Sequence, residues 1–465
     1  MSRWWHNGGQ KAAATRTFTQ TVVGRNRMRD LRVCWICLVL LPWGAFGQAG
    51  PAGDALRSAR EAYSQGHYDE AESQYLTAEK EAESGGPNEA RLARVLNNLG
   101  VLYQREAKYD EAEQALRRAL VIWQKQADPR PLELATTLNN LASLYTYRSR
   151  YSEAEPLYRQ CLALREKSLG PENAQVAIAL NNLGEFYWEQ GKLAEAEPLY
   201  RRAVFIKEKT LGPADPGLAA SLNNLGTLCM RQGKYSESES LYKRSLAVRQ
   251  AAFGPEHPEV ANSLNNLASL YSVQGRYAEA EPMYLRSLSM TERYLGLDHP
   301  DVACGLNNLA QLYFSQKKYA EAEPLLKRAL AIREKALGPN SPGVAEILDN
   351  LAGAMLLEYK QVSVDLLYLR SLAIRKKVFG PESPQVLTSL SGLAFAYTQE
   401  GKLWEAEHTY FEALTLIAKQ KKPDAQALAR VYVNLADLYS LEGKHKKARK
   451  MAEKAKGLRD QAASS

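Results

Sequence analysis

The sequence has 465 residues, 45% apolar and 24% charged, a composition typical of a folded protein that excludes a disordered or collagen-like chain. The net charge of +8 comes from the two ends: residues 1–49 hold seven Lys or Arg and one acid, and from Lys419 onward there are twelve Lys or Arg and five acids. The body between them is slightly acidic, which excludes the continuous basic face that a nucleic-acid-binding protein needs.

Residues 1–49 are interpreted as an N-terminal leader. Arg29 and Arg32 precede an apolar run over residues 33–41, and residues 47–49 are Gly-Gln-Ala, the order expected of a secretory signal peptide. The run is shorter than the roughly twenty residues that span a bilayer. Met28 is the expected true start. We expect a periplasmic or secreted protein; a membrane anchor, if the leader is not cleaved, and a cytoplasmic protein, if it is not used, are the alternatives.

From residue 50 to 461 one phrase of 42 residues recurs, followed by a tail at 462–465. The tetrad Leu-Asn-Asn-Leu opens six units, and weakened copies open three more. The nine units begin at Leu96, Leu138, Leu180, Leu222, Leu264, Leu306, Leu348, Leu390 and Tyr432. A tenth unit, one residue shorter, begins near residue 55. Nine matches in one phase predict about ten stacked copies of one supersecondary unit.

Each unit has the pattern of two helices joined by a tight turn. Leu264, Leu267, Ala268 and Tyr271 fall on one face of a first helix, and a second helix is expected from about residue 278. Ser or Asp followed three residues later by Glu, as in Ser152 and Glu155, predicts a capping box at the start of several second helices. Gly-Pro pairs are expected to end the second helices, and further prolines to open the next first helices.

Small residues recur in columns that predict close helix packing. Two columns lie on the second helix, twelve and nineteen residues after a third column that directly follows each tetrad. The members of this third column are Gly100, Ala142, Gly184, Gly226, Ala268, Ala310, Ala352, Ala394 and Ala436. Tyrosines three residues later, such as Tyr145 and Tyr271, are expected in the core. Cys161, Cys229 and Cys304 have neither disulfide nor metal-ligand spacing and are interpreted as small core or groove residues.

These columns resemble the tetratricopeptide repeat over residues 55–460, and the 42-residue length with its Leu-Gly-Pro linkers is similar to the kinesin light chain subclass, here of a bacterial type. The resemblance implies an all-α, right-handed superhelical solenoid of about ten hairpins. Kinesin light chains carry a heptad segment before the repeats that the leader does not provide, so a motor cargo adaptor is less favoured. Residues 355–371 lack the turn glycine and predict looser packing, with a hinge as the functional alternative to simple drift.

No catalytic motif, phosphate-binding loop or zinc spacing is present in the sequence, so we expect no enzyme, no cofactor, no metal and no small-molecule substrate. His257 and His299 occupy equivalent linkers one repeat apart and are interpreted as loop or cap residues. The basic residues after residue 443 are interpreted as a solvated capping helix, the one place where nucleic acid could bind.

In the solenoid that the resemblance implies, first helices line a concave groove that binds partners. The second asparagine of each tetrad is expected to contact a peptide backbone, as in related repeat proteins. These residues are Asn98, Asn140, Asn182, Asn224, Asn266 and Asn308. The alternative is that the amides bond to neighbouring helices and set the stacking. Further groove candidates, with Trp188 and Phe314 as anchors, are Tyr147, Glu185, Trp188, Met230, Arg231 and Phe314. Phe314 could instead pack against helix ends.

Two functions follow from this interpretation. The first is a non-catalytic scaffold that binds proteins or extended peptides in the groove. The alternative is a structural or assembly solenoid that self-associates or docks on a membrane complex. Direct contact with a membrane is expected only through an uncleaved leader.

Overall fold

The computed structural model describes residues 51–84, 89–126, 130–358, 364–420 and 424–464, and all regular secondary structure in these ranges is α-helical. The predicted all-α class is confirmed. The leader at residues 1–49 lies outside the described residues.

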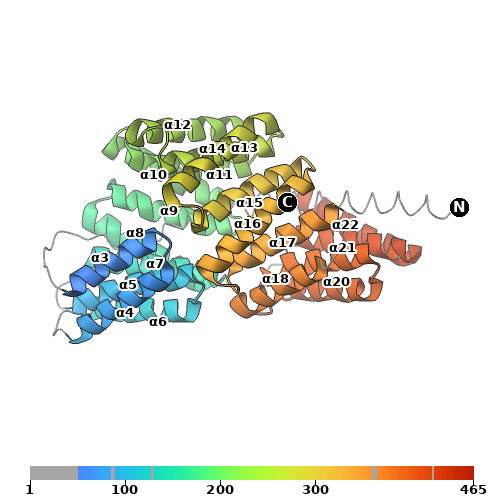
Figure 1. Cartoon of the computed structure of the whole chain (residues 1–465), viewed down its shortest axis with the longest axis horizontal. Coiled ribbons are helices and arrows are strands. Elements are labelled where there is room, and N and C mark those ends of the chain that lie inside the picture. The colour runs from blue at the N-terminus through green and yellow to red at the C-terminus, as the bar shows by residue number, and fades with distance from the viewer. Residues whose placement is uncertain (1–50, 85–88, 127–129, 359–363, 421–423, 465) are drawn as a thin grey trace. The chain divides into compact units, whose positions relative to one another are not determined.

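Twenty helices, α3 to α22, pair into successive hairpins (Figure 1). The first helices of the hairpins are α3 (Pro51–Ser64), α5 (Glu89–Arg105), α7 (Pro131–Tyr147), α9 (Ala174–Glu189), α11 (Pro216–Arg231), α13 (Pro258–Val273), α15 (Pro300–Ser315), α17 (Pro342–Leu357), α19 (Val386–Glu400) and α21 (Ala425–Leu441). The second helices are α4 (Tyr68–Ser84), α6 (Tyr109–Lys125), α8 (Tyr151–Leu169), α10 (Leu193–Leu211), α12 (Tyr235–Phe253), α14 (Tyr277–Leu295), α16 (Tyr319–Leu337), α18 (Val364–Phe379), α20 (Leu403–Ala418) and α22 (His445–Ser464).

The described chain divides into two compact units. The N-terminal unit contains residues 51–305 and 335–338, and the C-terminal unit contains residues 306–334 and 339–464. Within the N-terminal unit the first two hairpins touch the start of α15: Arg105 of α5 lies 3.9 Å from Asp301, and Gly66 in the turn of the first hairpin packs beside His299 and Pro300. Residues some 200 positions apart therefore meet inside this unit, and the repeat pattern alone does not predict this contact.

The linkers between hairpins follow the predicted chemistry. The second helix α10 ends at Gly212, whose φ of 86° suits glycine, and Pro216 opens α11. The Asp215 carboxylate accepts a hydrogen bond of 2.7 Å from the Gly217 amide, which caps α11. The predicted capping box at Ser152 is wrong: α8 begins one residue earlier, at Tyr151, and its N-cap residue Arg150 makes no side-chain cap. Tyr151, the first residue of α8, packs edge-on against Phe186 with 6.2 Å between ring centres.

The small columns lie where helices cross closely, as predicted. Ser238 on α12 donates a 2.8 Å hydrogen bond to the Gly226 carbonyl on α11, within one hairpin. Ser245 donates at 3.0 Å to the Ala219 carbonyl of the same first helix. Side chains this small let the two backbones approach within the reach of a hydroxyl, so a bulkier residue would separate the helices.

A second tyrosine column, on the second helices, fills the space that the small residues leave. Its members are Tyr158, Tyr200, Tyr242, Tyr284, Tyr368 and Tyr410, and all are buried. Tyr200 lies against Gly184 and Tyr242 against Gly226. Sequence analysis missed this column, although its spacing of 42 residues would have revealed it.

The irregular unit keeps its two helices. α17 ends at Leu357, and α18 begins at Val364, which is completely buried in the small-residue column. The connection between them, residues 359–363, lies outside the described residues. A hinge in this unit therefore stays a prediction.

Candidate protein-binding face

The tetrad asparagines form a ladder of hydrogen bonds between successive first helices. Asn140 donates to Asn97 Oδ1 at 3.1 Å, and Asn182 donates to Asn139 Oδ1 at 2.7 Å. In the C-terminal unit, Asn350 donates to Asn307 Oδ1 at 2.9 Å. In each pair the third tetrad position of one unit therefore reaches the second tetrad position of the unit before it.

Burial supports the stacking role for much of this ladder. Asn98, Asn140, Asn182 and Asn266 are buried, whereas Asn224 and Asn308 are half-buried. Asn97 also accepts from Thr137 at 3.2 Å, and Thr137 in turn accepts from the Trp123 indole at 3.1 Å. The alternative that these amides connect the repeats is thus observed for Asn140 and Asn182, while their contact with a peptide stays a prediction.

The other groove candidates divide into two groups. Met230 is buried, Phe314 packs edge-on against Tyr319 with 5.1 Å between ring centres, and Tyr147 lies 6.1 Å from Tyr109 on the preceding hairpin. These three side chains contribute to packing. Trp188 and Arg231, in contrast, come together from neighbouring first helices.

Trp188 on α9 is half-buried, and the Arg231 guanidinium of α11 lies 5.6 Å from its ring centre. The indole Nε1 is buried and has no acceptor among the described residues. The same helix carries the half-buried Glu185, and burial, reinforced by the neighbouring Glu189 carboxylate, raises the pKa of Glu185 to about 8. A donor without an acceptor, a cation and a carboxyl group with a raised pKa thus lie on adjacent first helices.

We call the surface on which Trp188, Arg231 and Glu185 lie the first-helix face. It is defined by residues that link one first helix to the next beyond the asparagine ladder. In the N-terminal unit the links include Arg94 to Glu133 at 3.2 Å and Gln104 to Ser143 at 3.3 Å. The side chains on this face differ from unit to unit, unlike the tetrads.

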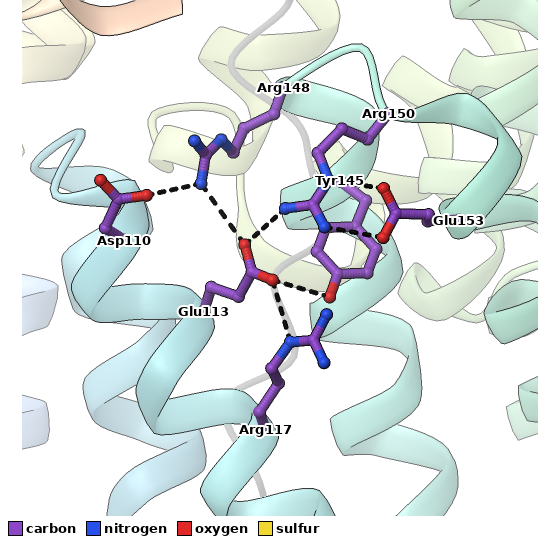
Figure 2. A network of polar contacts seen from close by, with 7 residues as sticks. All are labelled: Asp110, Glu113, Arg117, Tyr145, Arg148, Arg150 and Glu153. Atoms are coloured by element: carbon purple, nitrogen blue, oxygen red, sulfur yellow. Dashed lines mark hydrogen bonds and ion pairs between the residues drawn. The ribbon is translucent and has the colours of Figure 1, made fainter.

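A second ladder, which was not predicted from the sequence, joins several second helices to the hairpin that follows. In Figure 2, Glu113 on α6 accepts hydrogen bonds from Tyr145 at 3.0 Å, Arg150 at 2.5 Å and Arg117 at 2.9 Å. Arg148 bridges Glu113 and Asp110. Partial burial opposes ionisation of Glu113, but these hydrogen bonds outweigh it and hold the pKa of the carboxyl below its ordinary value.

The same glutamate clamp recurs at 42-residue intervals. Hydrogen bonds from Gln232, Arg201 and Lys234 lower the pKa of Glu197 to about 2. Hydrogen bonds from Lys243, Arg276 and Tyr271 lower the pKa of Glu239 to about 2 against the opposing effect of burial. The signal was available in the sequence, as a glutamate directly after most small residues of the second helix, and in several units 32 residues before the next tyrosine, as in Glu113 and Tyr145.

The histidines and cysteines have structural places. His257 Nδ1 accepts from the Glu259 amide at 3.2 Å and His299 Nδ1 accepts from the Asp301 amide at 3.2 Å, so both cap helices as predicted. Cys161 and Cys229 are buried, and desolvation raises the pKa of both thiols. Across the described ranges we find no cluster of three potential metal ligands and no helix suited to crossing a membrane.

Comparison with known proteins decides the family. A model of the tetratricopeptide repeat matches residues 55–125, 133–209, 217–293, 261–335, 301–360 and 367–419, and a second model of that repeat matches residues 429–461. The chain belongs to the tetratricopeptide repeat family. No curated protein matches it.

Solved structures of tetratricopeptide repeat and kinesin light chain-like proteins are similar to this chain. A Rap protein complexed with Competence and Sporulation Factor is 14% identical with a TM-score of 0.51, covering 80% of this chain and 98% of its own. BtubC from P. vanneervenii is 25% identical with a TM-score of 0.39, over 53% of this chain and 91% of its own. A putative kinesin light chain from Podosopora anserina is 27% identical with a TM-score of 0.37, over 44% and 97%. The first of these likenesses shows the shared fold.

Proposed function

We propose that this tetratricopeptide repeat protein is a non-catalytic scaffold that binds a protein or extended peptide along its first-helix face. The family is typical of protein–protein interaction, and its stacked hairpins present neighbouring first helices as one extended surface. The observation that carries the proposal is the pair Trp188 and Arg231, because an indole donor without an acceptor is costly in a finished core. A partner carbonyl or carboxylate would accept this hydrogen bond.

The pair has the composition of a binding hot spot. Tryptophan and arginine are enriched among the residues that dominate interface energies, and partial burial keeps such an anchor ordered before the partner arrives. The half-buried Asn224, one unit after Asn182, is the ladder residue best placed to give a further amide contact.

The test compares a partner's affinity for three chains. A partner recovered by affinity capture from the source extract is purified, and its binding to the wild type, Trp188→Ala and Phe205→Ala is measured by calorimetry. Phe205 is 57% exposed on the second helix α10, away from the first-helix face, and serves as the matched aromatic control. We expect Trp188→Ala to lose about 2 kcal/mol or more and Phe205→Ala to bind as the wild type does. Equal binding by all three folded chains would refute the proposed face.

We also propose that the chain is exported through its leader. The basic, apolar and small-residue order of residues 29–49 supports this. N-terminal sequencing of the mature protein is expected to begin near Gly50, and recovery of residues 33–48 on the secreted chain would contradict cleavage.

A further inference from the structure

The outer sides of the helices α18 and α20 expose large apolar residues. Trp404 is 68% exposed, Leu366 60% and Phe411 46%, and Leu369 is also exposed. Exposed apolar residues scattered singly are ordinary on protein surfaces, but a contiguous group marks an interaction site.

Helix spacing and an ion pair place these residues on two neighbouring second helices of the C-terminal unit. Trp404 and Phe411 are seven residues apart, on one side of α20, and the Trp404 ring stacks on His408 with 4.5 Å between ring centres. Leu366 and Leu369 are three residues apart on α18. The two helices are joined by Lys376 Nζ to Glu412 Oε1 at 2.7 Å. We call Leu366, Leu369, Trp404 and Phe411 the outer apolar patch.

The next second helix, α22, borders this patch with positive charge. It carries seven Lys or Arg and two acids, and Lys447 reaches Glu407 of α20 at 3.9 Å. The 42-residue spacing puts Lys446 at the position of Trp404 and Lys450 at that of His408, and both lysines are exposed. The surface therefore changes from apolar to basic between two neighbouring second helices.

We propose that this surface binds the headgroup region of an anionic lipid membrane. Exposed aromatic and leucine side chains insert at the boundary between headgroups and acyl chains, while adjacent lysines hold the negative headgroups. Tryptophan is the side chain most enriched at that depth. A second copy of the chain fits less well, because a symmetric contact through this surface would draw two strongly basic helices together.

Membrane contact through the outer apolar patch involves the folded repeats, whereas the sequence suggested such contact only through the leader. Membrane binding through the leader and through the repeats can be distinguished, because the leader is identical in all variants of the repeats. The first-helix face is also unchanged in those variants.

The test is co-sedimentation of the full chain with vesicles of phosphatidylcholine alone or with about one-third phosphatidylserine. We expect binding to the anionic vesicles that weakens in high salt. The double variant Trp404→Ala/Phe411→Ala should bind at least about tenfold more weakly. The double variant Lys446→Ala/Lys450→Ala should lose about 25-fold, near fivefold for each lysine. Phe205→Ala, which removes an exposed aromatic from α10, should bind as the wild type does.

Five outcomes would overturn the proposal. The first is absence of vesicle binding, and the second is binding that none of the patch variants weakens, which would assign it to the leader. The third is equal binding to neutral vesicles. The fourth is a concentration-dependent rise in molecular mass that Trp404→Ala/Phe411→Ala abolishes, which would make the patch a contact between copies of the chain. Capture of an acidic protein through the patch, with no vesicle binding, would likewise reject the lipid.

Discussion

At the scale of single residues, the ladder asparagines are expected to stabilise the repeats through their mutual hydrogen bonds. Asn182→Ala removes the 2.7 Å bond to Asn139 and leaves a buried acceptor, which should cost about 1–3 kcal/mol in urea unfolding. Asn224→Ala, in the same column but half-buried, should cost less, because alanine is the better helix former and water reaches the site. If Asn182→Ala leaves stability unchanged and lowers only partner affinity, the ladder serves the partner.

Glu185 supplies a residue-scale prediction about pH. Because its pKa in the folded protein is raised to about 8, ionisation of the buried carboxyl disfavours the folded state. Between the unfolded value of roughly 4.3 and pH 8 the folded protein holds the proton more tightly, so stability falls as pH rises through this window. Glu185→Gln should therefore unfold at higher denaturant concentration than the wild type at pH 8. The difference should shrink toward pH 4, and a constant difference would contradict the assignment.

At the scale of helices, the irregular unit packs against the next first helix in a way that leaves no room for a side chain at position 392. Gly392 on α19 stands where most units carry the second tetrad asparagine, and the buried Tyr368 ring of α18 fills the space that a Cβ at residue 392 would need. Gly392→Ala should therefore destabilise the C-terminal unit by about 1–3 kcal/mol. Gly353→Ala on α17 is the matched control, since its nearest neighbours lie 3.6 Å from the added carbon. The control should be neutral or gain up to about 1 kcal/mol from helix propensity. Equal effects of the two substitutions on the unfolding midpoint would refute this packing.

Protonation of the clamp glutamates in acid is expected to weaken the contacts between hairpins. The pKa of Glu239 is lowered to about 2 in the folded protein, so its contribution is complete above the unfolded value near 4.3 and is lost as pH falls toward 2. Glu239→Gln should lower stability at pH 7 by about 0.5–1 kcal/mol, because the carboxylate is partly exposed. The variant should also show a flatter loss of helicity, by circular dichroism, between pH 4.5 and 2. An unchanged acid transition would mean that the clamp does not hold the hairpins.

The sequence predicted the helices well because one pattern is repeated nine times. Periodicity, small residues and Gly-Pro pairs act locally, so their effects survive in each copy. The group that each asparagine amide binds was harder to infer, because an amide hydrogen-bonds equally well to a peptide backbone and to a neighbouring amide. Only the placement of Asn140 beside Asn97 distinguishes these two roles. The contact of Gly66 with Pro300 depends on how several successive repeats stack on one another. No local sequence signal encodes that stacking.

At the scale of the whole molecule, stability is expected to be distributed among neighbouring hairpins. Within each unit, neighbouring hairpins are joined by ladder or clamp contacts, as between Asn182 and Asn139 in the N-terminal unit and between Tyr439 and Glu407 in the C-terminal unit, so each unit is expected to behave as a row of coupled segments. In such a scaffold the side chains that face a partner can vary between units, while the ladder keeps each pair of first helices ordered. Partner selection would then depend on the variable residues between the ladders, with Trp188 and Arg231 as the clearest example.

The central claim is that a partner lies along the first-helix face, and site-specific photo-crosslinking tests it most directly. A benzophenone side chain is introduced at Glu189, which adjoins Trp188 on α9, and in a second chain at Phe205 on the outer side of α10. Both chains are irradiated with the purified partner. The account predicts a crosslinked product from position 189 and none from position 205. A product from position 205 with none from position 189 would contradict it.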